Sequence, residues 1–242
     1  MSGEAGDDPG LGPVVNRAPP ARPRWGRRSP GGTDGGLGSD RGGASYAALD
    51  LGTNNCRLLV ARPTSNSFRV VDAFSRIIRL GEGVTASRRI SEPAIELAID
   101  ALTVCGNKMK NKGVTRARLI ATEACRSAEN GEDFRVRVAQ DVGLELEVIN
   151  RETEARLAAT GCTTLIDPQA EGAVLFDIGG GSSELVRLSR PQQSCGGPPL
   201  PQINGWISLP HGVVTLAERH GGISGSPGSY EAMVGEVAAA IA

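Results

Sequence analysis

This chain of 242 residues lacks several features that mark membrane, secreted and nucleic-acid-binding proteins. It has no apolar run long enough to cross a bilayer, and no apolar segment follows a basic start, as a signal peptide requires. Its formal net charge is −1, so the chain as a whole carries no field that would draw it to nucleic acid or to an anionic membrane. We therefore expect a soluble protein that binds any anion at a local site.

Metal-binding and disulfide patterns are also scarce. The two histidines, His211 and His220, are too few for a histidine-based metal cluster. The cysteines are odd in number and include no Cys-x-x-Cys pair, which argues against a disulfide framework and a zinc site; they are Cys56, Cys105, Cys125, Cys162 and Cys195. Such cysteines fit a reducing cytoplasm best, and we predict a cytoplasmic protein.

The first 45 residues differ in composition from the rest of the chain. Residues 1–45 are crowded with glycine and proline and hold almost no aliphatic run. A segment of this kind cannot bury enough apolar surface to offset the entropy lost when the chain becomes ordered. We predict a disordered tail over this stretch, followed by a structured chain from Tyr46.

From Tyr46 onward, apolar patterns predict alternating strands and helices. A helix should run from about Ser91 as N-cap to Lys112, because apolar residues recur there at helical spacing. Strands are predicted at 46–49, 56–61, 68–74, 118–122, 144–149, 172–176 and 184–188, with further helices at 132–142 and 152–165. Three antiparallel strands followed by alternating helices and strands favour a mixed α/β sheet covered on both faces.

Two glycine-rich turns, each with one aspartate, are the most informative feature. They are Asp50-Leu51-Gly52-Thr53-Asn54 and Asp177-Ile178-Gly179-Gly180-Gly181-Ser182-Ser183. Glycine permits φ > 0 and has no Cβ, so successive backbone N–H groups can point into one anion-sized concavity. An aspartate beside phosphate would repel it unless a divalent cation such as Mg²⁺ lies between them or the carboxylate orients a water. The pair predicts a phosphate site, and the alternative is two ordinary hairpins with surface aspartates.

Six motifs, taken in order, resemble those of the exopolyphosphatase and guanosine pentaphosphate phosphatase (Ppx/GppA) family. They are Asp50–Asn55, Arg79–Gly83, Ala121–Arg126, Glu152–Leu157, Asp177–Leu185 and Ser208–Leu216. The resemblance implies an α/β fold of the actin-like ATPase (ribonuclease H-like) type with a mixed sheet. It also implies a first phosphate-binding domain over 46–190, a linker over 191–204 and the truncated start of a second domain over 205–242.

The resemblance further implies an activity and a set of site residues. The activity is hydrolytic release of terminal phosphate from polyphosphate or guanosine pentaphosphate, with Mg²⁺. Glu154 would be the catalytic acid that orients or deprotonates water, Glu184 the second essential acid, and Asp50 and Asp177 would hold the metal or its waters. Phosphate oxygens would be bound by Gly52, Thr53, Asn54, Arg126, Gly179, Gly180, Gly181, Ser182 and Ser183.

Other interpretations stay open at this point. From the residues alone, Glu152 and Glu154 are interpreted as acids that complement the dipole at a helix start, with Arg156 in a surface ion pair. An ATPase or kinase of the wider actin-like fold would share both turns, and a non-catalytic phosphate or alarmone-binding module would use them without hydrolysis. A homodimer is kept as a candidate assembly, because no residue pattern argues for or against one.

Overall fold

The computed structural model describes residues 43–65, 67–167, 169–192, 200–221 and 226–242. All of them belong to the unit Arg41–Ala242. Residues 1–42 of the expected tail and residues 193–199 of the expected linker lie outside the described residues.

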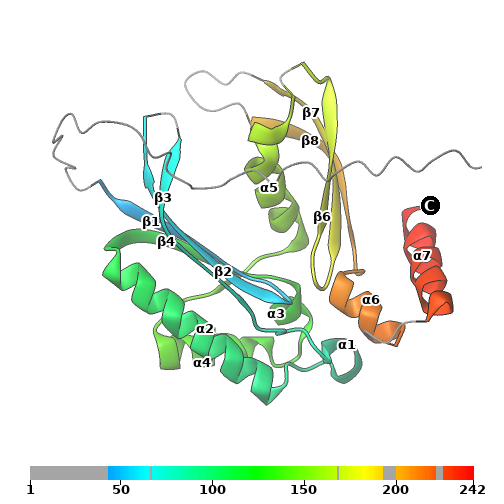
Figure 1. The fold of residues 1–242 in the computed structure, drawn as a ribbon, viewed down its shortest axis with the longest axis horizontal. Coiled ribbons are helices and arrows are strands. Elements are labelled where there is room, and N and C mark those ends of the chain that lie inside the picture. Colours follow the sequence, from blue (N-terminus) through cyan, green and yellow to red (C-terminus); the bar gives the residue numbers. More distant parts are fainter. Residues whose placement is uncertain (1–42, 66, 168, 193–199, 222–225) are drawn as a thin grey trace, which may run out of the picture. The chain divides into compact units, whose positions relative to one another are not determined.

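A five-stranded mixed sheet forms the first half of the described chain (Figure 1). Its strands lie in the order β3-β2-β1-β4-β5, where β1 is Ser45–Leu51, β2 Asn55–Pro63, β3 Phe68–Ile77, β4 Val114–Ala121 and β5 Glu147–Val148. Strand β1 pairs antiparallel with β2, as expected, and parallel with β4. The carboxyl ends of β1, β4 and β5 therefore reach the same edge of the sheet, and the segments that follow them begin there.

Helices α2 (Glu92–Asn111) and α4 (Gly131–Val142) lie side by side along one face of this sheet (Figure 1). Apolar residues at helical spacing, such as Ala98, Leu102 and Cys105, give α2 the buried face that packs on the core. Ser91 occupies the N-cap position of α2 as predicted, although its side chain makes no capping hydrogen bond. Helix α4 ends at Gly143, whose φ of 73° lies in the left-handed region that glycine adopts without strain.

A separate three-stranded antiparallel sheet follows, in the order β6-β7-β8. Its strands are β6 (Gly172–Ile178), β7 (Ser183–Gln192) and β8 (Leu200–Leu209). Helix α5 (Arg151–Cys162) continues as the short 3₁₀ helix Thr163–Leu165 and packs on this sheet through Ala155 and Ala159, which meet Val186 and Leu188. Helices α6 (Val213–Arg219) and α7 (Pro227–Ile241) follow β8. Strand β7 therefore contacts α5, and the glycine-rich turn that precedes β7 contacts α6.

Several local expectations differ from the structure. The strand expected at 144–149 is limited to Glu147–Val148, because it lies at the sheet edge and pairs with β4 alone. The strands at 172–188 pair with each other and with β8, so the proposed boundary at 190 falls inside β7. Proline and glycine had suggested a linker at 191–204, whereas the described part of that stretch extends a hairpin ladder. Two short helices, α1 (Val84–Ser87) and α3 (Glu123–Ser127), were not expected.

No helix in the described part of the chain is long and apolar enough to cross a membrane. The four cysteines that can be described, Cys56, Cys105, Cys125 and Cys162, are free thiols. Cys195 lies outside the described residues.

Candidate active site

The first glycine-rich turn joins β1 to β2. The Gly52 N–H donates to the Asn55 carbonyl oxygen at 2.9 Å and closes the turn. Asp50 lies one residue before the end of β1, opposite Arg57 of β2 in the strand register. Burial raises the pKa of the Asp50 carboxyl and the Asp177 charge adds to this, while Arg57 opposes it. The turn therefore presents a partly desolvated carboxylate next to a cation.

The second turn, between β6 and β7, repeats this arrangement. The Gly179 N–H donates to the Ser182 carbonyl oxygen at 2.9 Å, and Asp177 lies opposite Glu184 in the register. The Ser183 hydroxyl donates to the His211 carbonyl oxygen at 2.6 Å, which ties the turn to the segment before α6. Both turns are thus closed by the same kind of hydrogen bond and carry an acid at the equivalent strand position.

The two turns touch each other, and glycine is required at the contact. A Cβ on Gly181 would lie 2.8 Å from Thr53 Oγ1, and one on Gly180 would lie 3.0 Å from Thr53 Cβ. The expected reason for the glycines was partly wrong, because none of Gly52 and Gly179–Gly181 has φ in the left-handed region. Their missing Cβ atoms allow the close approach, and left-handed backbone plays no part.

Helix α6 fixes the second turn from the other side. The N–H groups of Val213 and Val214 donate to the carbonyl oxygens of Gly179 and Gly180 at 3.0 and 2.9 Å. Within the described residues, the N–H groups of Thr53, Asn54, Gly180 and Gly181 donate to no protein acceptor. The turns therefore keep backbone donors available, which is what an anion site requires.

One cavity of about 190 Å³ lies where the turns meet. Eleven of the predicted site residues line it: Asp50, Gly52, Thr53, Asn54, Glu154, Asp177, Gly179, Gly180, Gly181, Ser182 and Glu184. The two remaining predicted residues, Arg126 and Ser183, are not among its lining residues. Sequence-distant turns and both predicted acids are therefore brought to a single space.

Glu154 reaches this cavity from the first turn of α5. The helix begins after Asn150, whose side-chain oxygen accepts the Thr153 N–H at 2.8 Å and so caps it. Glu152 pairs at the surface with Arg156 at 2.9 Å, as the ion-pair interpretation expected, but Glu154 does not join this pair. Instead it accepts a hydrogen bond of 3.1 Å from Arg126 Nη2.

The surroundings of Glu154 change its acidity. Burial raises the pKa of Glu154 to about 7, with further upward contributions from the charges of Glu184 and Asp50 and an opposing one from Arg126. A carboxyl with this pKa is partly protonated near neutral pH, so it can both accept and release a proton there.

Glu184 is the most deeply buried acid of the site, with 2% of the residue exposed. The Ser208 hydroxyl donates to its Oε1 at 2.8 Å. Burial raises the pKa of Glu184 and the Asp177 charge adds to this, while hydrogen bonds from Ser208 and Ser182 oppose the shift. The site therefore collects carboxyl groups that repel one another, an arrangement typical of functional sites.

Comparison with known proteins identifies the family. The model of the Ppx/GppA phosphatase family matches residues 59–222. The chain belongs to this family. Its mixed α/β fold matches the folds of solved Ppx/GppA structures, and the actin-like type stays what the sequence motifs imply.

Solved Ppx/GppA structures agree with this assignment. A family member from Aquifex aeolicus is 32% identical with a TM-score of 0.59, over 73% of this chain and 54% of that one. An exopolyphosphatase-like protein is 30% identical with a TM-score of 0.71, over 82% and 60% of the two chains. An exopolyphosphatase from Cytophaga hutchinsonii, 24% identical with a TM-score of 0.65 over 72% and 53%, shares the fold. The chain spans between 53% and 60% of the length of these proteins.

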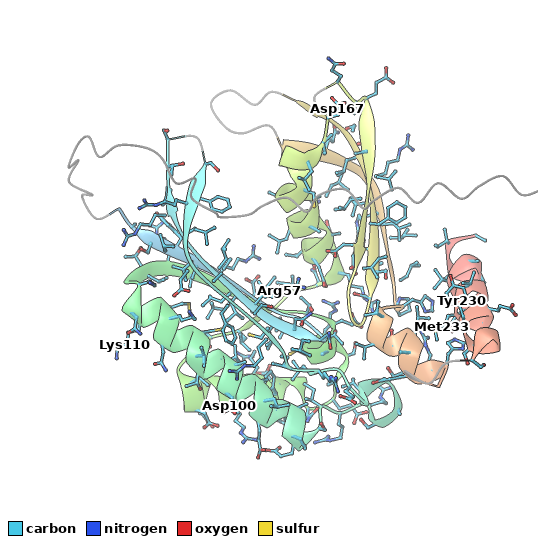
Figure 2. All side chains as sticks on the ribbon, in the orientation of Figure 1. Arg57, Asp100, Lys110, Asp167, Tyr230 and Met233 are labelled. Atoms are coloured by element: carbon cyan, nitrogen blue, oxygen red, sulfur yellow. The ribbon has the colours of Figure 1, made fainter. Side chains whose placement is uncertain are left out.

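Six lining residues of this cavity were not among the predicted site residues: Asn55, Arg57, Thr122, Glu123, Ile178 and Val213. Figure 2 shows Arg57 on β2, on the side of the sheet away from α2. Register could have revealed it, since pairing Leu51 with Cys56 puts Asp50 opposite Arg57. Glu123 belongs to a motif that had been recognised, Ala121–Arg126, but only its arginine was assigned a role.

Carboxylate oxygens are the donors that the side chains of this cavity could offer to Mg²⁺. Within the described ranges, no group of three or more His, Cys, Asp or Glu residues is arranged to hold a metal ion. Mg²⁺, however, is usually bound by one or two carboxylates together with waters and phosphate oxygens. Asp50 and Asp177 line the same cavity, and the Asp177 charge raises the Asp50 pKa. Two carboxylates in one cavity, beside backbone N–H groups that have no protein acceptor among the described residues, fit that requirement.

Proposed function

We propose that this chain carries the catalytic site of a phosphoanhydride hydrolase that removes terminal phosphate from inorganic polyphosphate or guanosine pentaphosphate. Membership of the Ppx/GppA family at about 30% identity supports the reaction class. The observation that carries the proposal is the position of Glu154, a carboxyl with a pKa of about 7, in the cavity where the two glycine-rich turns meet.

The backbone would bind the substrate and the acids would direct water. The free N–H groups of Thr53, Asn54, Gly180 and Gly181 would donate to oxygens of the terminal phosphoryl group. Glu154 would accept a proton from the attacking water while the water oxygen bonds to the terminal phosphorus. The bond between that phosphorus and the bridging oxygen would break, and the bridging oxygen would leave with the shortened phosphate chain. Glu184 would serve as the second acid, held in place by Ser208.

A divalent cation completes this proposal. Asp50 and Asp177 would hold Mg²⁺ or its waters, and the bound ion would offset the charge of the phosphate chain. Arg57, opposite Asp50, adds a positive charge from the protein on the same side of the cavity. Phosphate would then meet the bound cation, Arg57 and the backbone N–H groups, while the carboxyl groups would bind the metal or direct the water.

A second candidate function is phosphate or alarmone binding without turnover. The observation that favours it is the set of backbone N–H groups at Thr53, Asn54, Gly180 and Gly181, which would bind phosphate with or without turnover.

Phosphate release by two variants distinguishes these candidates. Long-chain polyphosphate, guanosine pentaphosphate and ATP are each incubated with the wild type, with Glu154→Gln and with Glu152→Gln, in Mg²⁺ buffer. Glu152 is the matched control because it lies on the same helical turn and pairs with Arg156 at the surface. The hydrolase proposal expects release by the wild type and Glu152→Gln, and a loss of about 10²-fold or more in Glu154→Gln.

Other results would change the assignment. Tight binding of guanosine pentaphosphate with no release from any substrate supports the binding module. Faster turnover of ATP than of polyphosphate supports an ATPase. Undiminished release by Glu154→Gln removes that residue from the mechanism.

A further inference from the structure

Glu123 is a buried acid that binds two arginines at once. It is 9% exposed and is the first residue of α3. Arg151 donates to it through Nη2 at 3.0 Å and Nε at 3.3 Å, and Arg126 donates through Nε at 3.1 Å and also through Nη2. The Ser127 hydroxyl donates to the Oε1 atom at 2.5 Å. Every oxygen of this carboxylate is therefore engaged by donors that favour its charged form.

Arg126 links this acid to Glu154. Its Nη1 donates to the Ile149 carbonyl oxygen at 2.6 Å, and its Nη2, which also binds Glu123, donates to Glu154 at 3.1 Å. One guanidinium is thus shared between Glu123 and Glu154, and the backbone before α5 holds its other end. The cavity-lining part of Glu123 lies against the second turn, where a Cβ on Gly181 would come within 3.0 Å of Glu123 Cγ.

We propose that Glu123 is a positioning residue of this site, which fixes Arg126 against Glu154 and balances the charges of Arg126 and Arg151. The catalytic importance of this role rests on the proposed function, whereas the contacts that support the role are independent of that function. With Glu123 in place, Glu154 meets an arginine whose charge is already offset by another carboxylate. Without it, the same guanidinium acts on Glu154 alone.

The charges around Glu154 give the sign of the effect. Glu184 on β7 and Asp50 on β1 face Glu154 and favour its protonated form, whereas Arg126 on α3 favours its charged form. Arg151, which lies on α5 together with Glu154, also interacts electrostatically with Glu154. Removing the Glu123 charge leaves both arginines uncompensated, so Glu154 should ionise more readily and become a weaker base. Glu123 itself does not titrate near neutral pH: burial would raise its pKa, but hydrogen bonds from Ser127, Arg151 and Arg126 hold the pKa below its usual value.

The test measures Glu154 directly by carbon NMR of ¹³C-glutamate-labelled protein in chelator-treated, metal-free buffer. The Glu154 signal is assigned by its absence in Glu154→Gln. In Glu123→Gln we expect the Glu154 titration midpoint to fall by about one pH unit, a tenfold loss of proton affinity. A midpoint that stays constant or rises overturns the proposal, since a rise would mean that Arg126 had moved away from Glu154.

Three additional variants and measurements complete the experiment. Ser127→Ala removes a hydrogen bond to Glu123 but no charge, so it should leave the midpoint unchanged; a fall as large as that of Glu123→Gln would contradict charge balancing. Glu123→Asp keeps the charge but withdraws it from Arg126, and a smaller fall is expected. This variant also decides the matter if Glu123→Gln does not fold, because an unchanged or higher midpoint in Glu123→Asp likewise refutes the proposal.

Activity measurements separate this inference from the proposed function. In Glu123→Gln, the acid limb of the phosphate-release profile should move to lower pH and kcat should fall, whereas the KM for polyphosphate should not rise. A KM increase with an unmoved acid limb would refute the positioning role. If the wild type releases no phosphate yet the NMR midpoint falls as expected, the proposed function fails and the charge-balancing role of Glu123 stands.

Discussion

The contact between the two turns can be tested by adding one methyl group to Gly181. In Gly181→Ala, the new Cβ would lie 2.8 Å from Thr53 Oγ1 and 3.0 Å from Glu123 Cγ, so one of the turns must move by roughly half an ångström to one ångström to restore van der Waals contact. Because Gly181 does not have φ in the left-handed region, alanine meets no backbone strain there. The substitution therefore changes the spacing of the turns and presses on Glu123, without adding backbone strain.

The expected magnitudes follow from this geometry. Overpacking of a closely packed contact costs typically about 1–3 kcal/mol, so the free energy of unfolding should fall by roughly that amount. A displacement approaching 1 Å in a positioned site can reduce activity by about 10²-fold, and kcat/KM for phosphate release should fall by about 10- to 100-fold. Urea unfolding followed by circular dichroism measures the first quantity, and phosphate release from polyphosphate measures the second.

Gly161→Ala is the matched control. Gly161 lies in α5, and a Cβ there would have no neighbour within 4 Å. Alanine in a helix is more favourable than glycine by roughly 0.5–1 kcal/mol, so this variant should be as stable as the wild type or slightly more so, with unchanged release. If Gly181→Ala releases phosphate as fast as Gly161→Ala, close contact between the turns is not needed for function and the reasoning is refuted.

Two further predictions concern acidity and metal. The Glu154 pKa is raised from 4.5 to about 7, so ionisation of Glu154 destabilises the fold as pH rises through this window. Glu154→Gln should therefore be more stable than the wild type by up to about 3 kcal/mol at pH 8, and equally stable at pH 4. Thermal unfolding at both pH values measures this, and an equal gain at pH 4 would contradict it. Asp50→Asn and Asp177→Asn should each weaken calorimetric Mg²⁺ binding in the presence of phosphate by about tenfold or more, whereas Asp100→Asn on α2 (Figure 2) should not. An unchanged Mg²⁺ affinity in both site variants would exclude these aspartates as ligands.

Much of the fold could be predicted from local patterns. The hairpin of β1 and β2, helix α2 and the capping glycine of α4 follow from apolar spacing and turn residues, which act between near neighbours in the chain. Sheet membership could not be predicted in this way. Strands β6 and β7 have the same apolar character as β1 and β2, and pairing with β8 depends on a segment beyond a proline-rich stretch.

The candidate site shows the same division. The two glycine turns with Asp50 and Asp177 were recognised as chemically suited to phosphate and the family resemblance added Glu154, and the structure brings them to one cavity. Arg126 had been assigned to phosphate, yet its described contacts are to Glu123, Glu154 and the Ile149 carbonyl. Its role in phosphate binding stays a prediction. Its side-chain partners could not be predicted, because contacts across the fold leave no periodic pattern in the sequence.

The amino-acid sequence by itself determined the kinds of chemistry available: two glycine turns with aspartates, acids at a helix start, and motifs typical of the Ppx/GppA family. The tertiary structure alone decided that Gly180 and Gly181 meet Thr53, and that Glu123 and Glu154 share one arginine. It also decided that burial and facing carboxyls raise the Glu154 pKa to about 7. Residue type sets what a group can donate, accept or ionise, whereas distance and burial set how strongly it does so.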